Sequence, residues 1–183
     1  MGTRGLTAVI KDSKPVIAQY GQWDHYPAGQ GAVILEFLRV ESNRKKLLKK
    51  LPKLRWLTDA ECKAIDNEKD WPQKYPWLSR DAGGKILEMV ASGHVSNGLS
   101  SEWEFAADSL FCEWAYVVDF DKGTLEVYRG FNKKGLAEGE RFRGMKAKDT
   151  EHRKEKYYPV RLVKSYKLAK LPTLKRFLSD LKA

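Results

Sequence analysis

Cysteine, histidine and long apolar runs are scarce in this chain. It has only two cysteines and three histidines among 183 residues. Cys62 and Cys112 are far apart in the sequence and no CxxC pair occurs, so neither a disulfide framework nor a structural zinc site is indicated, and two free thiols are expected. No apolar stretch approaches the ~20 residues that cross a bilayer. We therefore expect a soluble cytoplasmic protein with no metal, no cofactor and no membrane partner.

Signatures of nucleotide-binding folds and of base-reading modules are missing too. The sequence has no Walker lysine, no GxGxxG motif and no helix-turn-helix, zinc-finger or RNP pattern. These absences argue against base-specific recognition and leave contacts with a phosphate backbone open. No set of residues stands out as catalytic, so a non-enzymatic protein is the leading expectation.

The composition is that of a packed domain. Hydrophobic residues make up 42% of the chain and charged residues 32%, and the length suits one domain, residues 1–183. Runs of strand-forming residues bounded by turn residues predict strands at residues 4–11, 15–20, 112–120, 124–131 and 158–168. We therefore predict an α+β fold, with a mainly antiparallel sheet of about five strands and helices packed on it.

Apolar residues at helical spacing, preceded by capping residues, predict the helices. Thr58 and Glu61 have the spacing of a capping box, and Ser42, Ser79 and Thr173 are expected to cap the helices that follow them. The expected helices cover residues 32–39, 43–53, 58–68, 80–91 and 174–181. Residues 133–156 are polar, charged and without periodicity, which predicts a long mobile loop.

Positive charge is concentrated in two segments. The net charge is +10, to which residues 39–55 contribute +7, residues 143–183 contribute +9 and the remainder −6. Such segments favour a polyanionic partner, either nucleic acid or a host nucleoprotein or nuclease complex. A lysine-rich face that only keeps the protein in solution is the alternative. The candidate partner-binding residues are Arg44, Lys45, Lys46, Lys49, Lys50, Lys164, Lys167, Lys175 and Arg176.

A second candidate site is the connection between the second strand and the first helix, which reads QYGQWDHYPAGQG. Its glycines suit a phosphate, its aromatic rings suit a base, and Asp24 with His25 suits proton transfer, a metal ion or weak hydrolysis. The alternative is a structural loop whose rings fill the core and whose glycines allow positive φ. The residue types also allow covalent catalysis by Cys112 with His25 and Asp24, but nothing in the sequence beyond composition supports it. The candidate ligand-binding residues are Gln22, Trp23, Asp24, His25, Tyr26, Gly29 and Gly31.

Three strings carry a resemblance to a known family: MGTRGLTAVI, QYGQWDHYPAGQG and FCEWAYVVDFDKGTLEVYRGFN. They resemble a family of uncharacterised bacteriophage and prophage proteins, over most of the chain. The resemblance implies an accessory protein of a mobile element that acts in the cytoplasm of a bacterial host cell, and it implies no catalytic residues. By association with other small phage accessory proteins, it suggests an anti-CRISPR-like or other counter-defence inhibitor.

Overall fold

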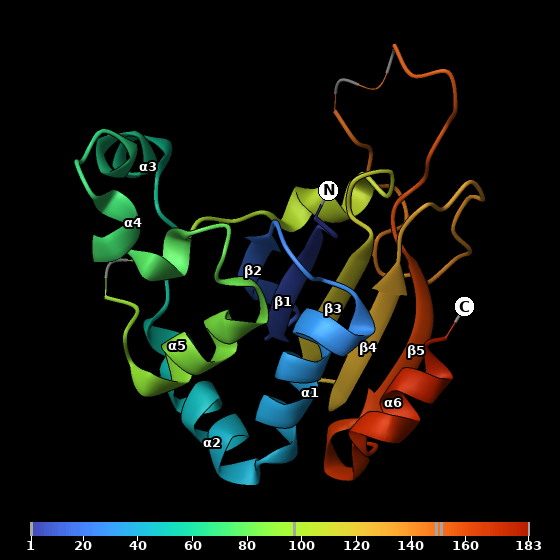
Figure 1. Ribbon diagram of the computed structural model, residues 1–183, viewed down its shortest axis with the longest axis horizontal. Coiled ribbons are helices and arrows are strands. Elements are labelled where there is room, and N and C mark those ends of the chain that lie inside the picture. Colours follow the sequence, from blue (N-terminus) through green and yellow to red (C-terminus); the bar gives the residue numbers. More distant parts are fainter. Residues whose placement is uncertain (1, 97, 149, 151, 183) are drawn as a thin grey trace.

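The computed structural model describes residues 2–96, 98–148, 150 and 152–182, and a five-stranded sheet runs through the middle of the fold (Figure 1). The strand order is β2-β1-β3-β4-β5. β1 and β3 are parallel, and the other neighbouring pairs are antiparallel. The strands are β1 (Gly5–Lys11), β2 (Lys14–Gly21), β3 (Trp114–Asp119), β4 (Thr124–Arg129) and β5 (Arg161–Lys167). The predicted α+β class with a mainly antiparallel sheet is confirmed.

Helices form most of the connection between β2 and β3 and the C-terminal end. The helices are α1 (Ala32–Arg39), α2 (Glu41–Lys50), α3 (Asp59–Asp66), α4 (Trp71–Lys74), α5 (Ile86–Ser92) and α6 (Leu174–Asp180). Thr58 and Glu61 form the predicted capping box at α3, and the Thr173 side chain accepts a hydrogen bond from the N–H of Arg176 at the start of α6. Both predicted caps are therefore confirmed.

The expected cap of α2 is wrong. The helix begins at Glu41, directly after Val40, whose backbone is extended. Ser42 therefore lies inside the first turn, and no side chain caps this helix. The sequence suggested Ser42 because serine is a favoured N-cap, but the sharp turn that follows α1 sets the boundary two residues earlier than residue 43.

The helix expected at residues 80–91 is also shorter than predicted. Gly83 has a φ of +48°, which a right-handed helix does not allow, so only a 3-10 turn forms there before α5 begins. A Cβ at Gly83 would lie 2.8 Å from the side chain of Gln30, so the glycine makes room for that side chain. Ser79 accepts a hydrogen bond from the N–H of Asp81 at 3.1 Å and caps only a local turn.

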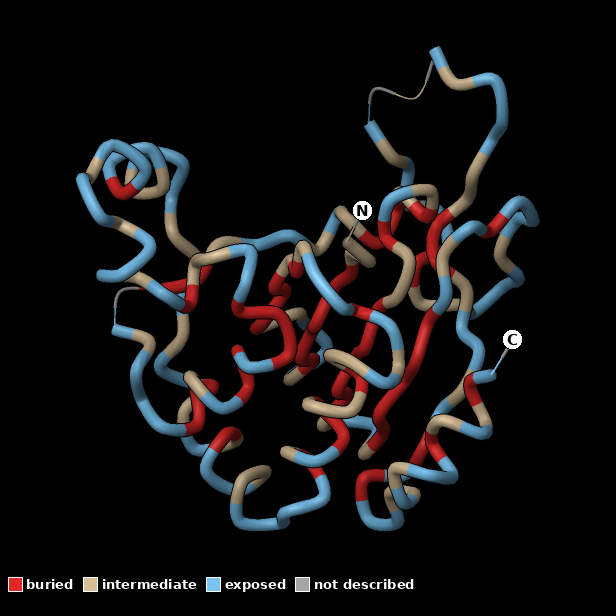
Figure 2. The backbone as a smooth tube through the Cα atoms, in the orientation of Figure 1, coloured by how far each residue is buried: buried red, intermediate tan, exposed pale blue. Residues whose placement is uncertain are grey.

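The two faces of the sheet are covered differently. Helices α1, α2, α5 and α6 pack on the face that carries Val9, Val118 and Leu125, which is called the helical face below. The opposite face carries Leu6 and Val117 and is covered by the 3-10 turn Trp103–Ala107 and by residues 136–145. Figure 2 shows the buried strands between these two covers.

The segment of residues 133–156 has no helix or strand among its described residues, and its Asp149 and Glu151 lie outside them. Part of it nevertheless belongs to the core. Phe142 is fully buried, and its ring centroid lies 4.9 Å from those of Trp103 and Tyr128. This loop therefore supplies a core side chain to the second face of the sheet, which polar composition alone did not indicate.

A buried ion network holds the same segment against the sheet. The Arg141 guanidinium donates to Glu126 at 2.8 Å and to Asp119, two carboxylates on adjacent strands that are almost inaccessible to solvent. The Tyr128 hydroxyl donates to Glu126 at 2.6 Å. Burial alone would lower the pKa of Arg141, but its hydrogen bonds to the two carboxylates outweigh burial and raise it. Each buried charge is thereby paired and hydrogen-bonded.

Candidate functional site

The cations of residues 39–55 lie mainly on the exposed side of α2. Leu47 is fully buried, whereas Lys45, Lys46 and Lys49 are exposed, as expected for an amphipathic helix. Lys45 pairs with Glu41 at 2.7 Å, and both side chains are largely exposed. Among the ion pairs of the described chain, Lys46 and Lys49 take no part. Since an exposed pair is weak, all three ammonium groups remain available to an anion.

Two further candidates on this helix are less accessible. The Arg44 guanidinium donates to the carbonyl oxygen of Leu38 at the end of α1. Lys50 is half-buried and its Nζ lies close to Gly93, where an added Cβ would come within 2.8 Å. These two side chains therefore help to join α2 to neighbouring segments, which leaves fewer of their donors for a binding partner.

The C-terminal candidates lie on β5 and α6. Lys164 and Arg176 both pair with Asp180, at 3.6 and 2.7 Å. Lys167 and Lys175 are exposed and, within the described ranges, form no ion pair. One carboxylate is thus shared by two of these four cations, and the C-terminal candidates keep a net positive charge.

The two basic sets flank α1 on the helical face of the sheet. Both α2 and α6 pack against α1, and Figure 1 shows them on either side of it. Arg39, at the end of α1, is exposed as well. In β5, Lys167 follows the inward-facing Tyr166 and therefore points to the opposite face of the sheet. The other eight candidate residues on α2, β5 and α6 are called the flanking basic surface below. Segments far apart in the sequence are thus brought to the same side of the molecule.

His25, in the second candidate site, is buried within the helical face. Its ring lies against the paired glycines Gly5 and Gly21, where an added Cβ would come within 2.4 and 2.0 Å of ring atoms. Its Nε2 lies 3.4 Å from the Thr7 hydroxyl, and the Tyr116 hydroxyl donates to its carbonyl oxygen at 2.8 Å. Burial lowers the pKa of His25 from 6.5 to about 4. The imidazole is therefore neutral at pH 7 and packed between strands and helix.

The turn after His25 is held by its own backbone. Asp24 has a φ of +57°, and its carbonyl oxygen accepts a hydrogen bond from the N–H of Gln30 at 2.7 Å. A Cβ at Gly29 would lie 2.2 Å from this oxygen, so the close approach requires glycine. Trp23 and Tyr26 remain 46% and 42% exposed. Backbone hydrogen bonds thus hold this turn in place, and the side chains of Trp23, Asp24 and Tyr26 are exposed.

The other candidates of this loop have structural contacts as well. The Tyr20 hydroxyl donates to the Gln22 side chain. A Cβ at Gly31, directly before α1, would lie 2.6 Å from the Tyr116 hydroxyl, so the absence of a side chain there makes room for Tyr116. The two cavities described below are lined by none of residues 22–31. These contacts favour the interpretation of residues 22–31 as a structural loop.

Cys112 is not placed for covalent catalysis. Its thiol is fully buried, and burial, reinforced by the charge of Asp108, raises its pKa, which suppresses the nucleophilic thiolate. Asp24, the third residue of the arrangement considered from composition, is exposed on the surface loop. Both cysteines are free, as expected.

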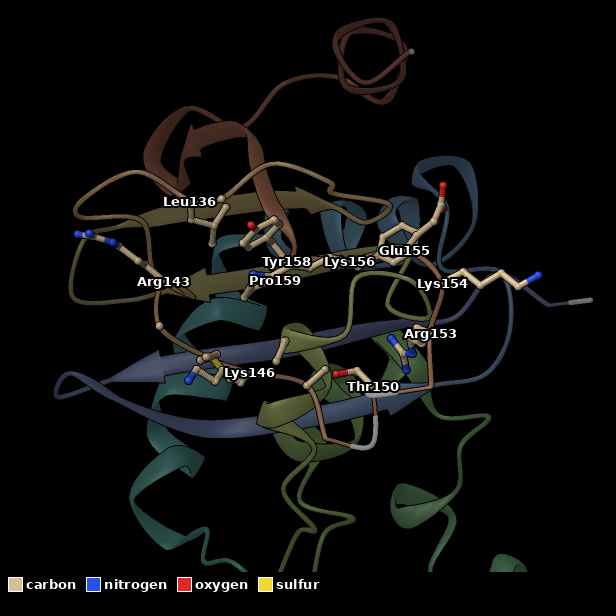
Figure 3. A pocket seen from close by; sticks show the side chains of 16 residues that line it. Leu136, Arg143, Lys146, Thr150, Arg153, Lys154, Glu155, Lys156, Tyr158 and Pro159 are labelled. Atoms are coloured by element: carbon tan, nitrogen blue, oxygen red, sulfur yellow. The ribbon is translucent and has the colours of Figure 1, made fainter.

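The structure adds a cavity that sequence reasoning missed. It has a volume of about 660 Å³ and lies among residues 135–136, 143–147, 150 and 153–159, beside Ala107 (Figure 3). Its rim includes Arg143, Lys146, Lys154 and Lys156. The net positive charge of residues 143–183 was visible in the sequence. Because residues 133–156 were expected to be a mobile loop, nothing indicated that these cations surround one cavity. This space is called the loop cavity below.

A second cavity of about 500 Å³ lies beside the end of β2. Gln19, Tyr20, Arg80 and Glu102 are among the residues that line it. Burial raises the pKa of Glu102 and of Tyr20. Its charged groups are of both signs, so it shows no preference for a cation or an anion.

Comparison with known proteins finds no matching family model, no matching curated protein and no matching solved structure. Within the described ranges, no helix is long and apolar enough to span a membrane. Groups of three or more side chains suited to hold a metal ion are likewise not found among those residues.

Proposed function

We propose that the protein binds a polyanionic target, through phosphate-backbone contacts from the flanking basic surface. The observation that carries this proposal is the placement of two basic segments, distant in the sequence, on either side of α1. Lys46, Lys49 and Lys175 are exposed there without an ion pair among the described residues. Ammonium groups in this state bind phosphates and release condensed counterions, which gives affinity without base specificity.

The resemblance to phage and prophage proteins supports a particular use of such binding. A small protein that occupies the nucleic-acid path of a host nuclease or other nucleoprotein would act as a counter-defence inhibitor of the anti-CRISPR-like kind. No group on this surface is arranged to break a bond, so inhibition would follow from occupancy alone. Because lysine contacts carry no sequence information, the target would be selected by shape and charge.

The test is charge reversal on α2 in the full chain. Lys45→Glu, Lys46→Glu and Lys49→Glu together should weaken binding to a 20-base-pair duplex roughly 100- to 1,000-fold at 0.1 M salt, since counterion release makes each contact worth roughly five- to tenfold there. The slope of log Kd against log salt should fall by about three. Fluorescence anisotropy at several salt concentrations measures both quantities.

The matched control is Lys63→Glu, Lys69→Glu and Lys74→Glu near α3 and α4. It changes the net charge equally and, like the α2 set, contains one lysine in an ion pair, here with Glu68 at 2.8 Å. The control should retain most of the wild-type affinity. Equal losses in both variants would show a response to net charge only, and unchanged affinity in the α2 variant would refute the proposed surface.

A further inference from the structure

The loop cavity is a second positively charged feature, separate from the flanking basic surface. It lies beside the sheet face that the helices leave open, where residues 136–145 and the Trp103–Ala107 turn form the cover. Figure 3 shows its wall as a ring of chain, with Leu136 and Tyr158 on one side and Thr150 on the other. Its volume of about 660 Å³ lies within the ~300–1,000 Å³ of small-molecule sites.

Among the described residues, two carboxylates beside this cavity, those of Glu155 and Asp108, are already engaged. Glu155 pairs with Lys133 at 2.9 Å and accepts a hydrogen bond from the Tyr157 hydroxyl, also at 2.9 Å. Asp108 binds the Arg153 guanidinium through two hydrogen bonds of 2.7 Å. Two ion pairs therefore help to hold the rim, and their carboxylates are already bound to other cations.

Four rim cations are left over. Arg143, Lys146, Lys154 and Lys156 are exposed and, in the part of the chain that the structure describes, have no carboxylate partner. Figure 3 shows Arg143 and Lys154 extending outward from the ring of chain. A cavity with several cations of one sign around it concentrates anions, because the low-dielectric wall focuses the field.

One wall of the cavity is flat and aromatic. The Tyr158 ring is half-buried, and Lys156 Nζ lies 4.9 Å from its centroid. Leu136, Met145 and Pro159 add apolar surface. A planar ring can stack on such a tyrosine while its charged substituent reaches a lysine. The combination of cations, a hydroxyl and a stacking surface matches one chemical class.

We propose that the loop cavity binds a nucleotide, with its phosphates at Lys146 and Lys156 and its base against Tyr158. The Thr150 hydroxyl, which points into the ring of chain, donates to a phosphate oxygen or to the sugar. The nucleotide comes either free or as one unit of a single strand, since both present the same phosphate and base.

Titration calorimetry of the full chain tests this proposal, with ATP, inorganic tripolyphosphate and a deoxythymidine 12-mer as the probes. Lys146→Gln with Lys156→Gln should weaken binding of ATP or the 12-mer roughly tenfold or more, because one charge contact near 4 Å in water is worth about a factor of five. Lys63→Gln with Lys69→Gln is the matched control and should retain wild-type affinity. Tyr158→Leu should weaken ATP binding and leave tripolyphosphate binding unchanged.

The outcomes separate the sources and the two proposed sites. If ATP binds the wild-type protein and the Lys146→Gln, Lys156→Gln variant binds it more weakly, the ligand is a free nucleotide. If ATP gives no heat, and this variant binds the 12-mer more weakly than the wild type does, the ligand is a single strand. No heat from any probe at millimolar concentration, or equal losses in variant and control, would overturn the inference. The α2 charge-reversal variant should bind ATP normally, so failure of the flanking basic surface and failure of the loop cavity are distinguishable.

Discussion

Acidification should destabilise the protein through His25. Burial holds the folded-state pKa near 4, whereas an unfolded histidine has a pKa of about 6.5. Between these values the unfolded chain binds a proton that the folded chain excludes, so stability falls as the pH drops through this window and levels off below pH 4. The loss from this residue is about 2 kcal/mol between pH 7 and pH 5, and about 3 kcal/mol once both states are protonated.

Urea unfolding followed by tryptophan fluorescence at pH 7 and pH 5 measures this loss. His25→Gln should be less stable than the wild type at pH 7, because it disturbs the packing against Gly5 and Gly21. Its free energy of unfolding should not show the loss of about 2 kcal/mol that His25 causes between pH 7 and pH 5. His94→Gln, at an exposed position, should keep the wild-type dependence. The proton resonance of the His25 ring, titrated in the folded wild-type protein, should move near pH 4. A midpoint near 6.5, or equal pH dependence in wild type and His25→Gln, would refute the buried neutral ring.

Two further predictions concern the segment that covers the second face of the sheet. Arg141→Met leaves the buried carboxylates of Asp119 and Glu126 without their cation and should lower the free energy of unfolding by about 3–5 kcal/mol; a loss below about 1 kcal/mol in urea titration would show that the network is unimportant. Phe142→Ala removes a fully buried ring and should cost about 3–5 kcal/mol, measured in the same way. Unchanged stability in this variant would mean that residues 133–156 do not pack on the sheet in solution.

Hydrophobic periodicity predicted helices and strands well where the residues it places inward are also the ones that pack in the core. Residues 32–39 form α1 at the predicted bounds, and the turn after residue 120 joins β3 and β4 as expected. Phe177 in α6 and Leu181 directly after it are buried at the predicted spacing. These elements depend on neighbours in the sequence, whose periodicity is visible without the fold.

Features set by distant contacts were not predicted. Gly83 keeps α5 from beginning near residue 80, and its lack of a side chain makes room for Gln30, more than fifty residues away. In β5, Leu162 is 40% exposed, and a register shift that the sequence does not reveal interrupts the pairing of this strand with β4. Asp119, in a buried strand, did carry a readable signal, since an inward-facing carboxylate needs a cation.

The candidate sites show the same limit. The sequence located both basic segments, but only their shared packing against α1 shows that they occupy one side of the molecule. The loop of residues 20–31 drew attention because it is rich in polar and aromatic residues. Its glycines, however, are required because the His25 ring, the Asp24 carbonyl and the Tyr116 hydroxyl lie too close for a Cβ. Composition could not distinguish glycines that admit a ligand from glycines that admit the protein's own atoms.

The parallel pairing of β1 with β3 has a consequence for how the chain is made. About 100 residues separate these strands, so a ribosome adding about 5–20 residues per second needs roughly 5–20 s to deliver β3 after β1. Throughout that interval the nascent hairpin has an unsatisfied inner edge, which can pair with a foreign strand. Production of this protein should accordingly depend on chaperone supply more than the stability of the finished molecule would suggest, and slower translation should lengthen the exposure of this edge.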